Sequence, residues 1–393
     1  MAIYAKINKD TLLFIRLQKQ ISFDYIERIA KFDEEKMSCW EDLTSKKFPT
    51  INQAKTLARC YHVPFAGFYM NSSDINIKRL PVMRNLRTLQ WADVDNTALN
   101  LAILDLMDYR ELLVVSKKER GEEIPSFDLS FYGNNPIAWA RYIRKKIGLS
   151  KEDQFKCKSA RKLYLLIRER VENCGIFIHC FTGLPVEEVR GIAVYDNDDM
   201  PIIGINENDR YPAKSFSIIH ELVHIIKRST AICNEMNNSF SAEREEQFCN
   251  AVAGAVLVPK DFFQDQLERV EKNGIDMLVI ETLAKRFSVS KEVIIRRMLD
   301  YEKISRDDYN VYADEIHRQF EIEKNNAKLD RKATGKSIPR NIPRETVDRT
   351  STLLCKTFLQ GYQTGAFDKQ DISRYLGINQ KHISGFLREV TKW

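Results

Sequence analysis

The chain has few of the features that mark secreted, membrane or redox proteins. Its 393 residues contain eight cysteines, and no two of them are spaced as C-x-x-C, so zinc ribbons and thioredoxin-type redox sites are excluded. No apolar run approaches the roughly 18 residues of a membrane-spanning helix. The first residues lack the basic stretch and apolar core of a signal peptide. We therefore expect a cytoplasmic protein with free thiols and no membrane contact.

Other common catalytic signatures are also missing. The sequence contains no glycine-rich phosphate loop, no G-x-S-x-G elbow, no long-period repeat and no low-complexity tract. With 44% hydrophobic residues it can form packed cores, and its length predicts two or three domains. Helical periodicity dominates, but between residues 175 and 206 three short apolar runs have the composition of strands, and the last two form a hairpin pattern around residues 196–199.

A histidine pair lies in the most apolar helix that the sequence predicts. Residues 216–226 read FSIIHELVHII, so His220 and His224 lie on one helix face with Glu221 between them. In this H-E-x-x-H pattern the imidazoles bind zinc, and the glutamate is the general base for a water whose pKa zinc lowers to about 7. About 0.01 chance matches are expected in a chain with six histidines. The alternative is a pair of hydrogen-bonded core histidines.

The third ligand is expected from the next helix, since catalytic zinc usually has three protein ligands. Glu246 shares a helix face with the small residues Ala253 and Gly254, which would allow close approach to the histidine helix. Glu245 instead shares a face with apolar residues of the expected core. We therefore predict zinc ligation by His220, His224 and Glu246. The competing glutamates in this segment are Glu243, Glu245 and Glu246.

These segments resemble the ImmA/IrrE metallo-endopeptidases. The resemblance rests on RGIAVY, MPIIGIN and FSIIHELVH, on the E-x-x-x-N spacing of Glu246 and Asn250, and on AVAGAVLVP. It implies the same three zinc ligands and Glu221 as the catalytic residue. Val223 stands where glycine is common and Cys249 where alanine is common; neither change removes a ligand, and we do not expect Cys249 to become one.

The N-terminal residues resemble an Xre-type helix–turn–helix. The similar segments are CWE, FPT, QA, LA and VP between residues 39 and 64, and Lys31 stands at the turn position where glycine is usual. The expected recognition helix has five acids against one lysine, which would repel DNA phosphates. We therefore expect this domain to bind a protein and consider DNA binding doubtful. The charged residues are Asp33, Glu34, Glu35, Lys36, Glu41 and Asp42.

Two C-terminal segments also carry signals. Residues 324–349 hold eight basic and three acidic residues, most of the net charge of +6; we interpret them as a solvated linker, with a phosphate-binding strip as the alternative. Residues 371–390 have a weak helix–turn–helix pattern. Elsewhere, His179, Tyr195 and Tyr211 are expected to be structural, although both tyrosines are candidates for stabilising an oxyanion.

The expected fold class is mainly α, with an α+β zincin-like domain and helical regions at both ends. Expected boundaries are 1–72 for the helix–turn–helix, 73–150 for a helical connector, 151–300 for the zincin-like domain, and 301–393 for a helical region with a basic linker. The predicted function is a Zn²⁺ endopeptidase that cleaves a regulatory protein such as an Xre-type repressor. The alternative is a DNA-binding regulator whose zincin domain is a sensor or scaffold.

Overall fold

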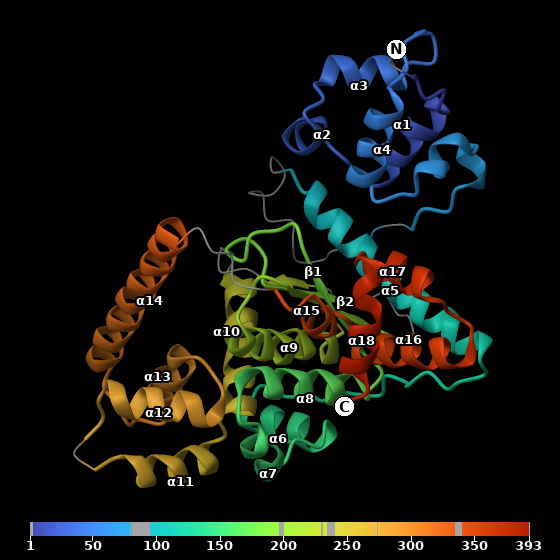
Figure 1. Cartoon of the computed structure of the whole chain (residues 1–393). Coiled ribbons are helices and arrows are strands. Elements are labelled where there is room, and N and C mark those ends of the chain that lie inside the picture. The colour runs from blue at the N-terminus through green and yellow to red at the C-terminus, as the bar shows by residue number, and fades with distance from the viewer. Residues whose placement is uncertain are drawn as a thin grey trace. The chain divides into compact units, whose positions relative to one another are not determined.

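Helices with one small sheet make up the chain, as the sequence predicts. The computed structural model divides into two compact units, residues 1–112 with 181–185, and residues 113–180 with 186–393 (Figure 1). The boundaries expected at residues 72, 150 and 300 stay predictions. The structure describes residues 3–78, 80, 95–195, 200–228, 231–233, 240–272, 274–334 and 340–392.

Short capped helices build the first unit. Each of its first four helices begins after a residue whose side chain accepts a hydrogen bond from the backbone N–H three positions on, the usual N-cap arrangement. Two 3₁₀ turns follow, and the long helix α5 (Thr97–Glu119) begins in this unit. The four helices are α1 (Lys9–Gln18), α2 (Phe23–Ala30), α3 (Glu34–Glu41) and α4 (Ile51–Cys60), and the turns are η1 (Phe65–Tyr69) and η2 (Ser72–Asp74).

A four-stranded sheet lies at the centre of the second unit, with strand order β1-β3-β2-β4. The expected hairpin is present, because β2 pairs with β3 in antiparallel register, and β4, which the sequence did not predict, pairs antiparallel with the other side of β2. The strands are β1 (Phe177–Phe181), β2 (Gly191–Val194), β3 (Ile202–Asn206) and β4 (Ala231–Cys233).

Helices pack around this sheet. The helix α9 (Tyr211–Ile226) contacts β2 and β3 and also α8 (Ala160–Glu172), beside which it runs (Figure 1). The helix α10 (Phe240–Leu257) packs against α9 and α6 (Pro136–Lys146). The remaining helices of this part are α7 (Lys151–Lys156), α11 (Lys260–Val270), α12 (Met277–Phe287), α13 (Lys291–Asp300) and α14 (Arg306–Thr334).

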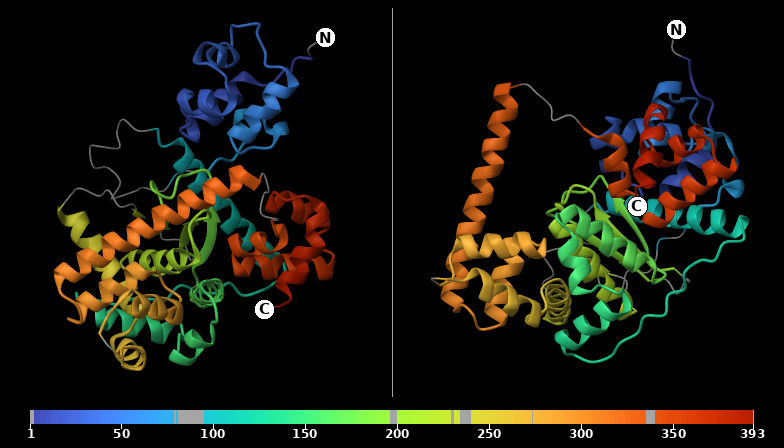
Figure 2. Two further views of the ribbon diagram at one scale, coloured as in Figure 1. Left: turned by 60° about the vertical axis from the view of Figure 1, so that its left-hand side comes forward. Right: turned by 60° about the horizontal axis from the view of Figure 1, so that its bottom comes forward.

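The last helices form a group of their own within this unit (Figure 2). A buried polar network joins them to α8: the guanidinium of Arg168 donates to the backbone oxygens of Val347 and Asp348, and Glu172 accepts from the Ser351 hydroxyl and the Thr352 N–H. The helices are α15 (Ile342–Arg349), α16 (Thr352–Thr364), α17 (Lys369–Leu376) and α18 (Ile383–Val390), with a 3₁₀ turn η3 (Gln380–His382) before the last.

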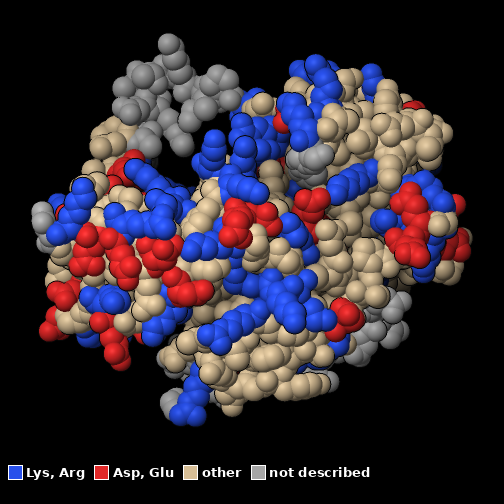
Figure 3. Space-filling view, turned by 90° about the horizontal axis from the view of Figure 1, so that it is seen from below, with Lys and Arg blue, Asp and Glu red and all other residues tan. Residues whose placement is uncertain are grey.

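The charged surface is mixed. On the face in Figure 3 acidic side chains lie in small groups among the basic ones, so both signs of charge are present. The basic segment is partly neutralised as well: Lys324 pairs with Glu321 and Arg340 with Glu345, whereas Lys336 lies outside the described residues. Among the described helices none combines the length and apolarity needed to cross a bilayer.

Candidate metal centre

The two histidines project from a helix that is almost completely buried. From Lys214 to Ile226 nearly every side chain of α9 is inaccessible, because the apolar residues around the motif pack against the sheet, α8 and α10. His220 is 5% exposed, Glu221 1% and His224 0%. Three ionisable side chains in such a helix are costly unless bound groups or ions compensate them, which makes this the first place to look for a metal.

The ring nitrogens of the pair point at one position. The Nε2 atoms of His220 and His224 are 3.3 Å apart. Two nitrogens that are each about 2.0–2.1 Å from a tetrahedral zinc ion lie about 3.3 Å from one another. The observed spacing therefore fits joint ligation of one ion.

Glu246 supplies the third side chain at this position. Its carboxylate oxygens lie 3.0 Å from His220 Nε2 and 3.4 Å from His224 Nε2, again the separation of ligands around one small ion. Glu245 lies on the outer side of α10, where it pairs with Lys227 at 2.9 Å and approaches His224 Nδ1 only to 3.9 Å. The side chain of Glu243 lies outside the described part. Of the two glutamates whose side chains are described, only Glu246 has oxygens near both Nε2 atoms.

Cys249 lies closer to the pair than the sequence indicated. Its Sγ and one nitrogen each of His220 and His224 are all within 4.8 Å of one another, and the three side chains form a buried group able to hold a metal ion. Burial and the nearby Glu246 carboxylate raise the pKa of the Cys249 thiol well above its usual range. The carboxylate of Glu246 also approaches both Nε2 atoms directly, at 3.0 and 3.4 Å, so Glu246 and Cys249 both lie near the position on which the two nitrogens converge.

The Glu246 carboxylate is held in its charged form. Burial alone would raise its pKa, but hydrogen bonds and charge interactions with His220 and His224 outweigh this effect and lower the pKa to about 2. An anionic oxygen beside two imidazole nitrogens is a donor set that suits Zn²⁺. The residues present therefore fit the metal that the motif implies.

An outer shell orients the first histidine. The Oδ1 atom of Asn250, one turn after Glu246 on α10, lies 2.9 Å from His220 Nδ1. A proton on Nδ1 satisfies this hydrogen bond and leaves the Nε2 lone pair free for a metal, the usual role of such partners. The E-x-x-x-N spacing thus has a physical reason that the sequence alone did not supply.

A glycine makes room for the predicted base. Glu221 lies against β2 at Gly191, where an added Cβ would come within 2.1 Å of Glu221 Oε1. Any larger residue at position 191 would therefore displace the carboxylate. The sequence analysis quoted this glycine only as part of RGIAVY, because nothing local indicates which helix faces it.

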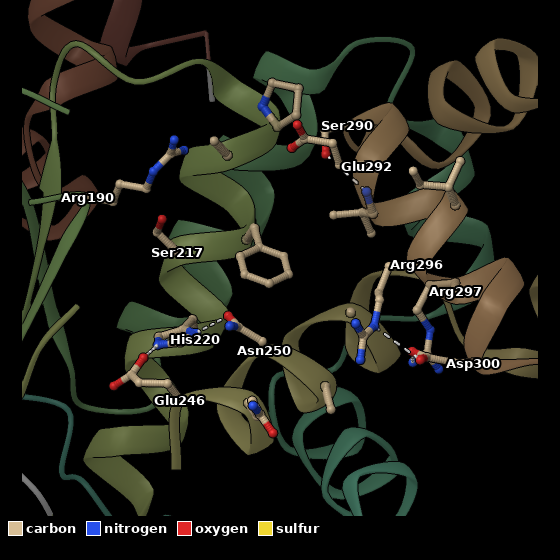
Figure 4. Close-up of a pocket in the computed structure, with 18 of the residues that line it drawn as sticks. Arg190, Ser217, His220, Glu246, Asn250, Ser290, Glu292, Arg296, Arg297 and Asp300 are labelled. Atoms are coloured by element: carbon tan, nitrogen blue, oxygen red, sulfur yellow. Dashed lines mark hydrogen bonds and ion pairs between the residues drawn. The ribbon is translucent and has the colours of Figure 1, made fainter. Parts of the chain in front are cut away.

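The centre opens into a cavity of about 710 Å³. Figure 4 shows His220 between Glu246 and Asn250 at one end, while Arg190 and Ser217 lie along the same side. Across the cavity Arg296 and Arg297 both pair with Asp300, at 3.2 and 2.8 Å. The sequence analysis missed this wall, which comes from α13 and the start of α14. The lining includes Arg190, Phe216, Ser217, His220, Glu221, Glu246, Asn250, Glu292, Val293, Arg296, Arg297, Asp300 and Tyr309.

The other residues considered in the sequence lie elsewhere. The Tyr195 hydroxyl accepts from Arg228 at 2.9 Å, and the Tyr211 hydroxyl donates to Asp348 at 2.5 Å; neither tyrosine lines the cavity. His179 is buried in β1, and its Nδ1 accepts from the Ser351 N–H at 3.3 Å. Burial and nearby arginines lower the pKa of His179 to about 3, so its ring is neutral.

Comparison with known proteins places this centre inside a recognised domain. No curated protein matches the chain. Among solved structures, a Mycobacterium tuberculosis transcriptional regulator is similar with a TM-score of 0.29 and 16% identity; the match covers 48% of this chain and 51% of that one, about half of each. Residues 181–299, which include β2 to α12, most of α13, and His220, Glu221, His224 and Glu246, match the peptidase M78 family, described as the IrrE N-terminal-like domain.

Proposed function

We propose that the chain is a zinc-dependent endopeptidase and that its substrate is a regulatory protein of the Xre repressor type. One observation carries the proposal: two imidazoles and the Glu246 carboxylate converge on one position, beside Glu221, in a cavity within a peptidase M78 domain. His220, His224 and Glu246 would hold the ion. When bound, zinc polarises a carbonyl and makes water acidic enough to attack at neutral pH.

Glu221 performs the proton transfers. It accepts a proton from the attacking water and later delivers it to the amine of the departing peptide, as a general base that becomes a general acid. Its burial beside Gly191 keeps the carboxylate at one place in the cavity wall. The cavity has arginines and acids on the opposite wall, which offer charged and hydrogen-bonding groups to an extended polypeptide.

The test is cleavage with a matched catalytic variant. Zinc-loaded protein and Glu221→Gln are incubated with candidate repressors, and fragments are identified by mass spectrometry, with zinc per chain measured in parallel. We expect both proteins to bind zinc and only the parent to cleave, because an amide cannot accept the proton. Equal cleavage by Glu221→Gln would refute the assigned base. Absence of zinc from parent protein supplied with the metal would refute the metal centre.

We further propose that the first unit recruits this substrate through protein contacts. The α3 segment has fewer free charges than its sequence indicates, because Glu41 is buried against Arg16 at 2.7 Å and Asp33 caps the helix. Glu34 and Glu35, at the start of α3, remain exposed and form no ion pair among the described residues, and apolar Leu43, just beyond the other end of this helix, is 70% exposed. An acidic surface with an exposed leucine favours a protein partner over phosphates.

Docking of this kind raises the local substrate concentration at the cavity. Leu43→Lys with Glu35→Lys should raise the KM for repressor cleavage at least several-fold while leaving cleavage of a short peptide from the same scissile region unchanged. An equal effect on both substrates would contradict recruitment. Tight DNA binding that depends on α3 would favour the alternative regulator function instead.

A further inference from the structure

The C-terminal helices α17 and α18 follow the order helix, turn and helix of a helix–turn–helix motif, outside the residues that match the peptidase domain. Asp368 and Asp371 form a capping box at the start of α17, and the helix ends at Gly377 in the left-handed conformation with φ of 63°. The Ser373 hydroxyl then donates to the Ile378 carbonyl at 2.6 Å and closes the turn. A short helix, a glycine turn and a second helix are the elements of this motif.

One face of the second helix is buried. In α18 the apolar residues Ile383, Phe386 and Val390 are 0–3% exposed. This helix packs against α15 and α16, and an added Cβ at Gly385 would come within 2.7 Å of Pro343, so the contact with α15 is close. The packing fixes which face of α18 is turned away from the core.

The opposite face is polar, basic and exposed. Lys381, Ser384 and Arg388 follow one another at spacings of three and four residues, which places them on one side of η3 and α18. All three side chains are exposed. Lys381 and Arg388 form no ion pair within the described part of the chain, and neither does the exposed Arg374 of α17.

The acids of this region are already engaged. Residues 340–392 carry nine basic and five acidic side chains, a net charge of +4. Every one of the five acids has a local role: two form the capping box of α17, one pairs with Arg161, and the other two pair with neighbouring cations. These acids are Asp368, Asp371, Asp348, Glu345 and Glu389. Residues 368–392, which span α17 and α18, carry five basic and three acidic side chains, so the net charge of this pair of helices is positive.

We propose that this motif binds double-stranded DNA, with α18 as the helix that enters the major groove. Lys381 and Arg388 would contact phosphates or guanine edges, and Ser384 between them would contact a base or phosphate, as in other motifs of this kind. Arg374, on the first helix, is placed for the phosphate backbone. The inference concerns a different surface from the metal centre and does not rest on the proposed peptidase function.

The test measures binding of the full chain to a labelled duplex pool of random sequence, about 20 base pairs long, by fluorescence anisotropy between about 50 and 200 mM salt. We expect Lys381→Ala/Arg388→Ala to weaken DNA binding at least 10-fold at low salt. The slope of the logarithm of the binding constant against the logarithm of the salt concentration should decrease in magnitude by about 2. Ser384→Glu, which adds one negative charge on the same face, should also weaken binding. All three side chains are exposed, so thermal unfolding should be unchanged.

The matched control is Lys46→Ala/Lys47→Ala, which removes two exposed charges from the first unit. It should bind DNA as the parent does, and so should Glu221→Gln. Three outcomes would overturn the proposal: no DNA binding by the parent at low salt, unchanged binding by the α18 variants, or loss of binding in the Lys46/Lys47 control alone. Preference for duplex RNA of the same sequence over DNA would also overturn it.

Discussion

We expect substitution of Gly191 to separate catalysis from metal binding. Gly191 is the first residue of β2 and pairs across the sheet with Ile205 on one side and Cys233 on the other, so the backbone at this position is held by both neighbouring strands. In Gly191→Ala the new methyl carbon would lie 2.1 Å from Glu221 Oε1, 2.8 Å from Cδ and 2.9 Å from Cγ. These separations are far below contact distance, and the strand cannot retreat. The Glu221 side chain must therefore move.

The size of that movement follows from the contact. An ordinary contact begins near 3.4 Å, so Oε1 must shift by about 1.3 Å. The helix itself cannot follow, because Leu222 and Ile219 beside it are 0% exposed and closely packed. A misplacement of about 1 Å in a catalytic group costs roughly 100-fold in rate, equivalent to about 2.7 kcal/mol of transition-state stabilisation.

Metal binding should survive the same change. The three atoms nearest to the new methyl all belong to Glu221, and none belongs to His220, His224 or Glu246. We therefore expect Gly191→Ala to bind one zinc per chain with the affinity of the parent while kcat/KM for repressor cleavage falls about 100-fold. Zinc content is measured by elemental analysis and affinity by chelator competition.

Gly67→Ala is the matched control, because a Cβ there meets nothing within 4 Å. It should change neither activity nor zinc content. If Gly191→Ala cleaves as fast as the parent, the placement of Glu221 against β2 is wrong. If Gly191→Ala loses zinc, the position of the three ligand side chains depends on the position of Glu221, which the geometry does not indicate.

Three further predictions concern other parts of the second unit. Loss of an outer-shell partner typically lowers metal affinity 10- to 100-fold. Glu246→Gln should lower zinc affinity by more than this, whereas the loss of zinc affinity in Glu245→Gln should not exceed this range. Chelator competition measures both affinities. The pKa of His179 is about 3 in the folded chain and near 6.5 in the unfolded chain, so the unfolded chain takes up the proton first as the pH falls. The free energy of unfolding should therefore decrease as the pH drops from 6.5 toward 3. In His179→Gln, urea unfolding should show a smaller decrease of this free energy over the same pH range. Arg168→Met leaves the buried Glu172 carboxylate without its cation and should reduce the free energy of unfolding by about 3–5 kcal/mol.

The ligand helices were predictable because their information is local. A spacing of four residues brings two histidines to one helix face whatever the rest of the fold does, and helix periodicity also separated Glu246 from Glu245. The assignments of His220, His224, Glu246 and Glu221 as functional residues stay predictions, but the structure brings the three ligand candidates together and lines one cavity with Glu246, Glu221 and His220.

Contacts between distant segments could not be read in the same way. Gly254 was expected to face the histidine helix, but an added Cβ there would lie 3.2 Å from the side chain of Arg297 in α13. The small size of Gly254 therefore leaves room for Arg297, which belongs to the opposite wall of the cavity. Glu41 counted as a free acid in the sequence but is buried against Arg16, 25 positions away. Such pairings depend on tertiary packing, which composition and periodicity do not encode.

Two segments with similar backbone geometry, one at each end of the chain, show why that geometry alone does not identify a ligand. Lys31 after α2 and Gly377 after α17 have almost the same left-handed φ, 60° and 63°, and each is followed by a short helix with a buried apolar face. The exposed charges have opposite sign: Glu34 and Glu35 at the start of α3, Lys381 and Arg388 on η3 and α18. Phosphate neutralisation requires cations, so we expect a protein ligand at the acidic segment and DNA at the basic one. Reversing the charge on each helix should therefore change the ligand while leaving the fold intact.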